Sequence, residues 1–452
     1  MIDSDVLVVG GGSAGCASAA ALSADGLRVL VADAGIHRSK QLAGELLHPD
    51  GLQDLEALGL GGGLWSSGAQ VIRGFAVIDA AGPRDSVCLL PYPGGEKGLA
   101  LEHAALVEPL LTQLEGRSGI TLWRQARLTA INRNDGSAIE ATISRSDGEH
   151  RVRAKLIVGA DGRASAVRRL LNIDEDREKL SSMLGLLVAA NHLPHPGFGH
   201  LFIGGLAPVL AYAISNDQAR VMIDVPSGTD SEALFASAEI LAGLPESLRE
   251  AVKSSLGSGR VLHAANETRL PKQVAVHRAV LVGDAAGCCH PLSASGLASS
   301  TRDARVLQKS IQESAHDIPR AVQLYVQRRR SAQRTRIALA SALYRTFTER
   351  TPEMAALRVG LFRYWGRSRN GRAVSMALLS TRESRMRIMA QEYARAVGHA
   401  VVGLFGRFPH PSQRKRPWGT AFGLMRTTLP HFRETIRGAV ADLRSSRPRR
   451  VD

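Results

Sequence analysis

The sequence predicts an α/β fold in three parts: a nucleotide-binding α/β domain, a second domain built on an antiparallel sheet, and a helical C-terminal region. Near the N-terminus, Asp5 to Val9 is a short apolar run that ends in a glycine-rich turn, followed by small helix formers and a second apolar run. Apolar and polar residues alternate from Thr121 to Val158, as in an antiparallel meander, and the segment from Met183 to Val225 is again strand-like. After about Ala304 the apolar spacing is almost wholly helical, with arginine-rich polar faces.

The chain length indicates more than one hydrophobic core. At 452 residues the chain exceeds the size at which single cores stop growing, so we expect two interleaved domains with the helical region appended. We place the nucleotide-binding domain at residues 1–70, 100–172 and 275–310, the antiparallel-sheet domain at 71–99 and 173–274, and the helical region at 311–452.

Composition and cysteine usage favour a globular protein of the reducing cytoplasm. Hydrophobic residues make up 44% and charged residues 22% of the chain, both close to globular averages. The N-terminus lacks the basic segment and cleavage site of a signal peptide, and no apolar stretch reaches ~18 uncharged residues, so neither export nor membrane spanning is expected. The four cysteines show no CxxC spacing, and we predict neither a structural disulfide nor a metal site.

The positive charge is concentrated in the C-terminal third. The chain carries a net charge of +15, yet residues 301–452 hold 31 Lys and Arg against 10 Asp and Glu, which leaves the rest of the chain acidic. This region lacks the interleaved aromatic residues and the zinc or RNA-binding signatures of a nucleic-acid-binding protein. We therefore expect anionic lipid headgroups as its partner, with peripheral attachment to the inner face of the membrane, and no nucleic acid. The alternative is a solvated helical surface.

The glycine-rich turn predicts a dinucleotide site. Gly10, Gly12 and Gly15 form a GxGxxG motif between a strand and a helix, where they permit a tight turn, close approach of a pyrophosphate and close helix packing. Asp33 ends the second strand, in the position where an acid accepts hydrogen bonds from a ribose. NAD and FAD share this fingerprint, so the choice between them needs other residues.

Two later motifs favour FAD. Val158 to Arg168 reads VGADGRASAVR, and Leu281 to Asp303 reads LVGDAAGCCHPLSASGLASSTRD. The second places Asp284 at the end of an apolar strand, where a carboxylate can hold a ribityl hydroxyl, and it lets a helix N-terminus approach the flavin after Pro291. The residues predicted to contact the cofactor are Gly10, Gly12, Ser13, Ala14, Gly15, Asp33, Ala34, Glu45, Asp161, Gly162, Asp284, Pro291, Gly296 and Leu297.

In this order and at these separations, the three motifs resemble the glutathione-reductase-type FAD-binding fold of flavoprotein monooxygenases. Longer segments are similar to squalene epoxidases, from near the N-terminus to roughly Trp365. The segments that carry this resemblance are GELLHPDGLQDLEALGL, PVLAYAISNDQARVMIDV, GDAAGCCHPLSASG and ALYRTF, which begin at Gly44, Pro208, Gly283 and Ala342.

The resemblance implies an FAD-dependent monooxygenase that acts on a lipophilic, isoprenoid-containing small molecule. One oxygen atom of O2 would pass from a flavin C4a-hydroperoxide to a carbon–carbon double bond, and the other would leave as water. The cofactor carries this chemistry, so no catalytic acid or base is assigned; Phe75 and His290 are the candidates that face the substrate. NAD(P)H would supply electrons, either directly or through a separate reductase, because no second GxGxxG domain is visible.

Several positions depart from the squalene epoxidase pattern. Phe75 stands where the family has a tyrosine, and Ala105 where it has an arginine that contacts FAD. Ala294 and Ser295 replace the first two of three glycines, and Gly287 to Cys289 replace Asn-Met-Arg. These departures leave FAD binding standing but favour a different substrate from squalene.

Three other features have both a functional and a structural interpretation. Glu45 resembles a family residue near the flavin edge, or is an acid in the first turn of a helix, stabilised by the dipole. His290 is either a polar group beside the flavin or a histidine satisfied by the backbone. The adjacent Cys288 and Cys289 are expected to pack rather than to carry out redox chemistry.

Four alternative functions fit parts of the sequence. A prenylated aromatic, such as an isoprenoid-tailed quinolone of secondary metabolism, is an alternative substrate, and its epoxidation can be coupled to an isomerase activity. An isoprenoid double-bond reductase shares the fold but turns over without O2. A flavin halogenase is disfavoured because no tryptophan lies in a Trp-x-Trp-x-x-Pro motif, and a non-enzymatic lipid carrier is supported only by Ala105.

Overall fold

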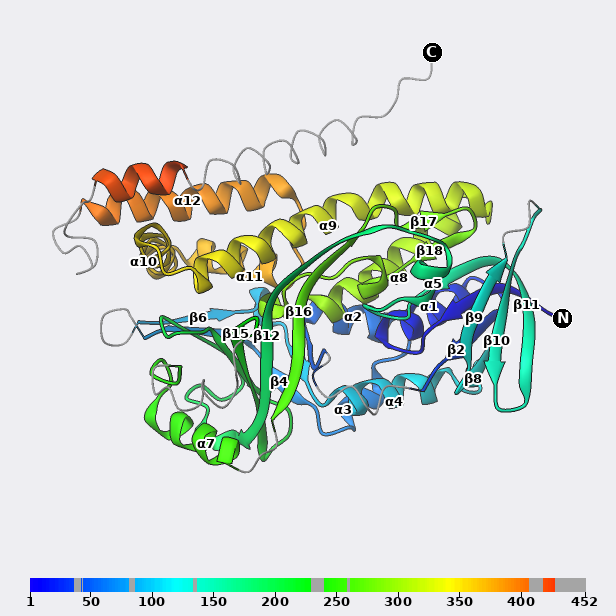
Figure 1. The fold of residues 1–452 in the computed structure, drawn as a ribbon, viewed down its shortest axis with the longest axis horizontal. Coiled ribbons are helices and arrows are strands. Elements are labelled where there is room, and N and C mark those ends of the chain that lie inside the picture. Colours follow the sequence, from blue (N-terminus) through cyan, green and yellow to red (C-terminus); the bar gives the residue numbers. More distant parts are fainter. Residues whose placement is uncertain are drawn as a thin grey trace, which may run out of the picture.

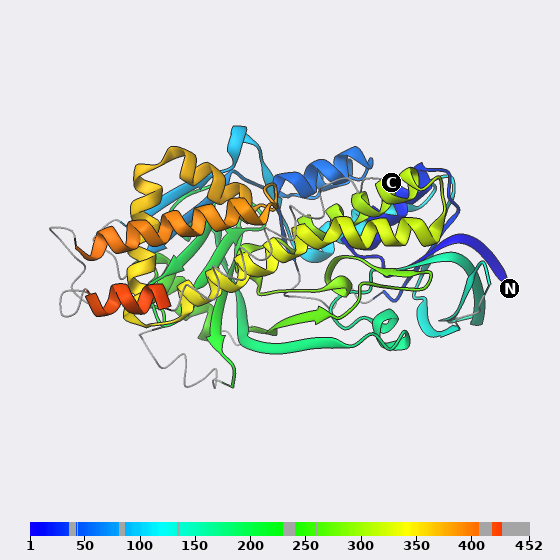
Figure 2. The ribbon, with the colours of Figure 1, turned by 90° about the horizontal axis from the view of Figure 1, so that it is seen from above.

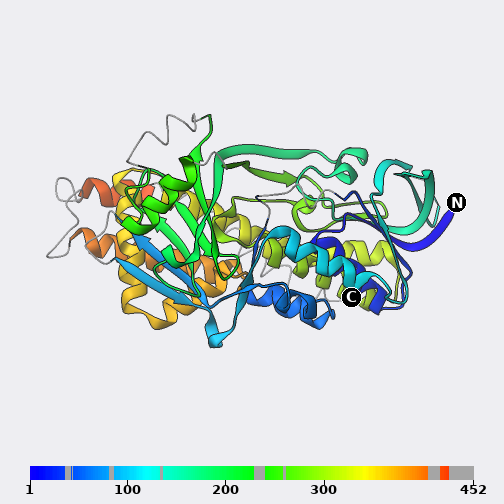
Figure 3. The same ribbon diagram turned by 90° about the horizontal axis from the view of Figure 1, so that it is seen from below.

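The computed structural model describes residues 1–35, 42, 44–80, 86–132, 136–228, 240–257, 261–405 and 418–426. It has an elongated shape, with the strands nearest the N-terminus at one end and a second sheet under a group of helices at the other (Figure 1). Two long strands, β12 (Glu175–Ala189) and β16 (Leu262–Pro271), pair with each other and run between the two ends (Figures 1 and 3). The predicted α/β fold with a helical C-terminal region is confirmed.

The first sheet has eight strands around a parallel core. Its central order is β17-β18-β11-β1-β2-β8, and the pairs from β18 to β8 are all parallel. The strands are β1 (Ile2–Val9), β2 (Val29–Asp33), β8 (Ile120–Arg124), β9 (Arg127–Asn132), β10 (Ile139–Arg145), β11 (Gly148–Gly159), β17 (Ala275–Val276) and β18 (Ala279–Leu281). The expectation of one antiparallel meander from Thr121 is wrong for its first strand, because β8 pairs in parallel with β2 and only β9, β10 and β11 form the antiparallel part.

Helices cover one face of this sheet. They are α1 (Ser13–Ala24), α4 (His103–Leu114) and α8 (Gly296–Glu313), and α1 packs along α8. Helix α1 consists of small residues, most of them buried, so it can approach both the sheet and α8 closely. The opposite face is covered by β9, β10 and the short helix α5 (Ala166–Leu170).

The second sheet has seven strands in the order β16-β12-β15-β14-β13-β5-β6. Every neighbouring pair is antiparallel except β13 with β5. The strands not yet bounded are β5 (Gly74–Asp79), β6 (Val87–Pro91), β13 (Gly199–Ile203), β14 (Val209–Ala213) and β15 (Gln218–Pro226). Side chains alternate between its two faces, as the period of a strand requires: Val209 and Ala211 contact the core under α7 (Glu246–Gly257), while Leu210 and Tyr212 face the helical region.

A small sheet and two short helices connect these parts. The small sheet has the order β3-β7-β4, formed by Leu46–Leu47, Gly98–Ala100 and Gln70–Ile72. Helix α2 (Pro49–Ala57) follows β3 and packs against α8, and α3 (Gly62–Trp65) packs against α4.

The C-terminal region is helical throughout its described residues. Helix α9 (Ile318–Thr348) begins at an Asp317 cap and crosses from the first sheet to the second (Figure 2). Helices α10 (Pro352–Arg367), α11 (Arg369–Leu379) and α12 (Met386–Leu404) follow, and residues 418–426 form one more helix. Within the described ranges, no helix is both long enough and apolar enough to cross a bilayer.

Candidate active site

The glycine-rich turn after β1 has room for backbone only. Gly10 has φ +104°, and a Cβ there would lie 2.6 Å from the Ala160 carbonyl oxygen. A Cβ on Gly15 would lie 1.8 Å from the carbonyl oxygen of Gly10, so α1 meets the turn as closely as a backbone allows. Ser13 and Ala14 open α1, and no side chain caps its N-terminus. This geometry fits the pyrophosphate of a dinucleotide, because a helix N-terminus and a close backbone approach both favour a bound phosphate.

Asp33 holds the far side of this turn. Its carboxylate is buried at the end of β2, where Oδ1 accepts a hydrogen bond from the Gly11 amide at 3.0 Å and Oδ2 accepts one from the Gly35 amide at 3.1 Å. Ala34 lies between β2 and Gly35. The acid therefore fixes the turn through the backbone, and a contact between Asp33 and a ribose stays a prediction.

The other two motifs lie at the same edge of the sheet. Asp161 lies two residues beyond the end of β11, and its Oδ2 accepts hydrogen bonds from the amides of Ala166 and Val167 at the start of α5, at 2.6 and 3.0 Å. Gly162 next to it has φ +78°. Asp284 lies in a 3-10 turn, η4 (Gly283–Ala286), just beyond β18. Because parallel strands end at one edge, the structure brings Asp284 and Asp161 to the edge that carries the glycine-rich turn.

A loop between η4 and α8, here called the flavin loop (residues 287–296), is held from two sides. It contains the 3-10 turn η5 (Pro291–Ser293), a left-handed Ala294 with φ +48° and the N-cap Ser295, and α8 starts at Gly296 with Leu297 as its second residue. Arg336 of α9 donates to Ser295 Oγ at 3.2 Å. On the other side, His48 Nε2 lies 2.9 Å from the carbonyl oxygen of Ser293.

His48 is a buried, neutral anchor for this loop. Its Nδ1 lies 2.7 Å from the Tyr92 hydroxyl, and burial lowers the pKa of His48 to about 4. A neutral ring satisfies both contacts: Nε2–H donates to the Ser293 carbonyl and Nδ1 accepts from the Tyr92 hydroxyl. His48 lies in the segment from Gly44 that is similar to squalene epoxidases. The sequence alone did not show that its side chain anchors this loop.

Phe75 lies on β5 beside this anchor. Its ring centroid is 6.0 Å from that of His48, and its side chain is buried. A Cβ on Gly199, its partner on β13, would lie 2.8 Å from the Phe75 ring, so the ring packs flat against backbone. Phe75 belongs to an apolar cluster that also contains Leu292 of the flavin loop and Leu210 of β14, which makes it part of the wall between the loop and the second sheet.

The position of Glu45 contradicts one of the two interpretations drawn from the sequence. It precedes β3 and lies outside the first turn of any helix, since α2 begins only at Pro49, so stabilisation by a helix dipole is wrong. Its buried carboxylate instead binds Arg220 of β15, with Arg220 Nη2 and Nε at 2.8 and 3.1 Å, and lies 3.5 Å from the Tyr212 hydroxyl. Burial acts to lower the pKa of Arg220, but the bonds to Glu45 raise it more, so the guanidinium stays charged.

His290 is held by a buried polar network. Its Nδ1 accepts from the Leu292 amide at 3.3 Å, and its Nε2 lies 3.1 Å from both Ser181 Oγ and Asp224 Oδ2. Asn266 Nδ2 donates to Ser181 Oγ and to Asp224 Oδ1, each at 3.0 Å. The network ties the flavin loop to β12, β15 and β16, so the contacts of His290 are those of a structural histidine.

The network and the ion pair contain residues that sequence reasoning missed. Arg220 and Asp224 are four positions apart on β15, and each is a charged side chain inside an otherwise apolar strand. That pattern was a usable signal, because a buried charge requires a partner. Arg336 and Asn266 gave no comparable signal, since their roles depend on contacts between distant segments.

Cys288, Cys289 and Ala105 are three further positions that the sequence singled out. Burial raises the pKa of Cys288 to about 11 and also raises the pKa of Cys289, so both are protonated thiols at neutral pH. Ala105 lies on α4 and packs against the core beneath the first sheet.

A parallel sheet with a glycine-rich turn, a terminal acid and the loop of residues 287–296 at one edge is typical of an FAD-binding oxidoreductase. Residues 5–169 match the family model for FAD dependent oxidoreductases. Residues 153–411 match the squalene epoxidase family model, which is more than half of the chain. The chain belongs to the squalene epoxidase family, and it is a flavin-dependent monooxygenase that binds FAD.

Individual relatives agree with this family. The chain is 26% identical over 393 residues to squalene epoxidase of Schizosaccharomyces pombe, covering 81% of this chain and 84% of the relative. It is 27% identical over 376 residues to squalene monooxygenase of Mus musculus, covering 80% of this chain but only 65% of the mouse protein.

Solved structures share the fold. The flavoprotein PqsL of Pseudomonas aeruginosa, in complex with 2-aminobenzoylacetate, superposes with a TM-score of 0.67 at 24% identity, over 77% of this chain and 97% of that one. p-Nitrophenol 4-monooxygenase PnpA of Pseudomonas putida superposes with a TM-score of 0.69 at 18% identity, over 87% and 99%.

Proposed function

We propose that the enzyme inserts one oxygen atom of O2 into a carbon–carbon double bond of an apolar, isoprenoid-containing substrate. Two electrons from NAD(P)H and a proton balance the reaction, so the products are an epoxide, water and NAD(P)+. Bound FAD would accept these electrons and carry out the chemistry with O2. The residues of the chain bind the cofactor, orient the substrate and exclude water.

The apolar wall facing the flavin loop is the observation that carries this proposal. The face of the second sheet that turns toward the loop and the helical region carries buried aromatic and aliphatic side chains, and Phe347 of α9 belongs to the same cluster: the sheet residues are Phe75, Leu90, Leu201, Ile203 and Leu210. The charges at its margin, Glu45 and Arg220, neutralise each other in a direct ion pair. Such a wall suits a hydrocarbon and keeps water away from the reacting centre.

Contacts around the flavin loop support proposed roles for individual residues. The turn at Gly10 and the N-terminus of α1 would hold the pyrophosphate of FAD, and Asp284 would hold its ribityl chain. His48 and Arg336 position the flavin loop from opposite sides. No side chain is assigned as an acid or base.

A prenylated aromatic, in which an aromatic ring carries an isoprenoid tail, is the second candidate substrate. The positions that depart from the squalene epoxidase pattern, Phe75 and Gly287 to Ser295, favour it over squalene. Epoxidation of such a ring would allow a coupled rearrangement.

The decisive experiment follows a single turnover of the reduced enzyme. FAD-loaded protein is reduced anaerobically, O2 is admitted, and absorbance and product mass are followed with squalene, with a prenylated quinolone, or with no substrate. A product heavier by one oxygen atom with one substrate supports monooxygenation and identifies its class. Saturation of a double bond before O2 enters means a reductase and contradicts the proposal.

We also propose that the enzyme works in the cytoplasm, docked on the inner face of the membrane. Large apolar side chains are exposed at the end of α12 and on the helix of residues 418–426: Val402, Phe405, Trp418, Phe422 and Met425. They lie within the basic C-terminal third, and aromatic residues beside basic ones suit an anionic bilayer surface. The basic segment Arg414 to Arg416 and residues 427–452 lie outside the described residues.

A further inference from the structure

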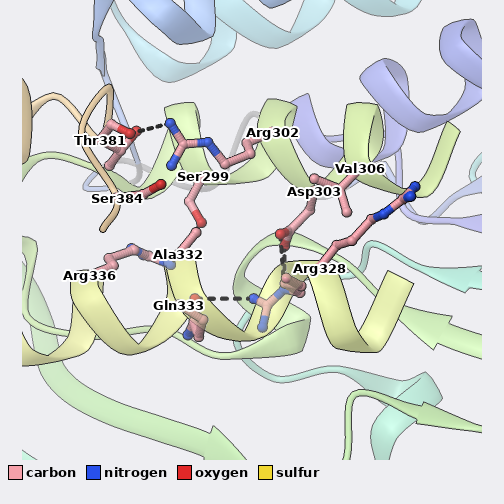
Figure 4. Close-up of a pocket in the computed structure, with 11 residues that line it drawn as sticks. Ser299, Arg302, Asp303, Val306, Arg328, Ala332, Gln333, Arg336, Thr381 and Ser384 are labelled. Carbon is pink, nitrogen blue, oxygen red and sulfur yellow. Dashed lines mark hydrogen bonds and ion pairs between the residues drawn. The ribbon is translucent and has the colours of Figure 1, made fainter. Parts of the chain in front are cut away.

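A polar cavity lies between α8, α9 and the connection from α11 to α12 (Figure 4). Its volume is about 260 Å³. Four arginines and one carboxylate line it: Arg302, Arg328, Arg329, Arg336 and Asp303. The cavity therefore carries an excess of positive charge, although it is set into the packed region between two helices.

Three of the four arginines lie within ion-pair distance of a carboxylate, Arg302 through Asp50 at 3.6 Å. Arg329 Nε lies 2.9 Å from Asp303 Oδ1, and Arg328 forms an ion pair with Glu313. Asp303 is further used by the Gly283 amide, which donates to its Oδ2 at 2.9 Å. The only acid of the lining is thus committed to Arg329 and the backbone.

Arg336 has no carboxylate partner. Its guanidinium donates to Ser295 Oγ, to Ser299 Oγ at 3.1 Å and to the Gly287 carbonyl, all uncharged acceptors. In the part of the chain that the structure describes, no acidic oxygen lies within the ion-pair distance of 4.0 Å, and only 8% of the residue is exposed. A buried charge without a counter-charge is costly, which points to an anion that arrives from outside.

Arg302 faces the same space from α8. It donates to the carbonyl of Thr381 (Figure 4), and its Nη2 forms an ion pair with Asp50 at 3.6 Å. Burial lowers the pKa of Arg302; the charges of Asp50, Asp54 and Asp303 act against this, and the charge of Arg336 adds a smaller lowering. A negative group between Arg302 and Arg336 would relieve this repulsion.

Thr381 supplies an unused hydroxyl. Its side chain lines the cavity and is only 6% exposed, yet its Oγ1 has no hydrogen-bond partner. Its φ of +67° lies in the left-handed region, which a β-branched residue rarely adopts. Gln333 Nε2, also in the lining, is a second buried donor without a partner. Buried donors without acceptors are rare, and here two of them line a space with excess positive charge.

We propose that this cavity binds a phosphate group, held by the guanidinium groups of Arg302 and Arg336 and by the hydroxyl of Thr381. Phosphate offers several strong acceptor oxygens and a charge of about −1.5 to −2, and the planar fork of arginine matches it in two-bond contacts. The cavity lies between α8 and α9, whereas the pyrophosphate of FAD belongs at the N-terminus of α1. Inorganic phosphate, a nucleotide phosphate and a lipid headgroup all supply this chemistry.

Calorimetric titration of the FAD-loaded enzyme with inorganic phosphate, in chloride buffer at constant ionic strength, tests the proposal. Filling the flavin site beforehand removes it as a competing phosphate site. We expect one saturable site, weakened at least ~10-fold by Arg302→Gln and by Arg336→Gln, because each removes a charged hydrogen-bond donor. Thr381→Val should weaken it less, since it removes one neutral donor and keeps the side-chain shape.

Arg330→Gln is the matched control, because it removes the same charge from an exposed position on α9. Retained flavin absorbance and far-ultraviolet circular dichroism show that each variant is folded. Equal phosphate affinity in the control, Arg302→Gln and Arg336→Gln proteins, or no saturable heat with the parent enzyme, overturns the proposal.

Competition identifies the source of the phosphate. If the group belongs to the reductant, NADPH displaces inorganic phosphate and NADH does so less well. If it belongs to a lipid, vesicles of phosphatidylcholine with phosphatidic acid displace it, whereas pure phosphatidylcholine vesicles do not. If neither NADPH nor the vesicles displace inorganic phosphate, the ligand is free phosphate, and the affinities of the variants alone support the site.

Discussion

The carboxylate of Glu45 and the guanidinium of Arg220 form a buried ion pair, with 2.8 Å between Oε1 and Nη2 and both side chains less than 5% exposed. Glu45 precedes the small sheet beside the flavin loop, and Arg220 lies on β15 in the middle of the second sheet. The pair therefore joins the small sheet to the second sheet, at the margin of the apolar wall.

Breaking this pair on one side should cost more than removing it entirely. Glu45→Gln leaves the Arg220 guanidinium buried without a counter-charge, and we expect a loss of about 3–5 kcal/mol in the free energy of unfolding. In the double variant Glu45→Gln with Arg220→Met no charge remains, so most of the loss should be recovered. Urea unfolding of the parent, the single and the double variants measures this; equal losses in the single and the double variant would contradict it.

Gly15→Ala should abolish FAD binding. The added Cβ would lie 1.8 Å from the Gly10 carbonyl oxygen, so α1 must move away from the turn that we predict to hold the pyrophosphate. The purified variant is expected to be colourless and to gain no flavin absorbance on incubation with FAD. Gly366→Ala is the control, because a Cβ there meets nothing within 4 Å and α10 should gain at most ~1 kcal/mol. A yellow Gly15→Ala protein would falsify the assignment of this turn.

Stability should fall between pH 6.5 and 4 because of two buried histidines. Burial lowers the pKa of His48 and of His200 to about 4, so both stay neutral in the folded protein while the unfolded chain takes up protons below about 6.5. The unfolded state then binds more protons, and stability decreases as pH falls through this window by about 3 kcal/mol for each histidine. Below pH 4 this contribution levels off.

His48→Gln separates the two histidines. Glutamine keeps an amide donor for the Ser293 carbonyl but does not titrate, so the pH dependence between 6.5 and 4 should shrink by roughly half. His263→Gln, at an exposed position on β16, should leave the dependence unchanged. The midpoints of urea unfolding at several pH values provide the comparison, and an unchanged slope in His48→Gln would show that His48 is not the titrating group.

Local sequence patterns predicted the parts of the fold that local rules govern. The turn at Gly10, the acid at the end of β2 and the helical region all follow from spacing within one segment. The pairing of β8 with β2 was missed, because an alternating strand has the same pattern in either orientation. Arg220 and Arg336 were missed as site residues for a related reason, since their partners are 175 and 41 positions away.

Membrane attachment should depend on the exposed aromatic residues of the C-terminal region. Trp418 and Phe422 are 78% and 68% exposed on the last described helix, and the Trp418 ring contacts Phe405 at 4.5 Å between centroids. Burial of a large apolar side chain contributes roughly 1.5–3 kcal/mol, and each basic residue near an anionic surface about 1 kcal/mol.

Trp418→Ser with Phe422→Ser should therefore reduce co-sedimentation with phosphatidylserine-containing vesicles more than ~10-fold. Trp65→Ser, which removes another exposed tryptophan near α3, is the matched control. High salt should weaken binding of the parent protein as well, because the basic residues act through screened charge. Binding that survives both substitutions, or a parent protein that never sediments with the vesicles, would place the enzyme away from the membrane and require its apolar substrate to arrive by another route.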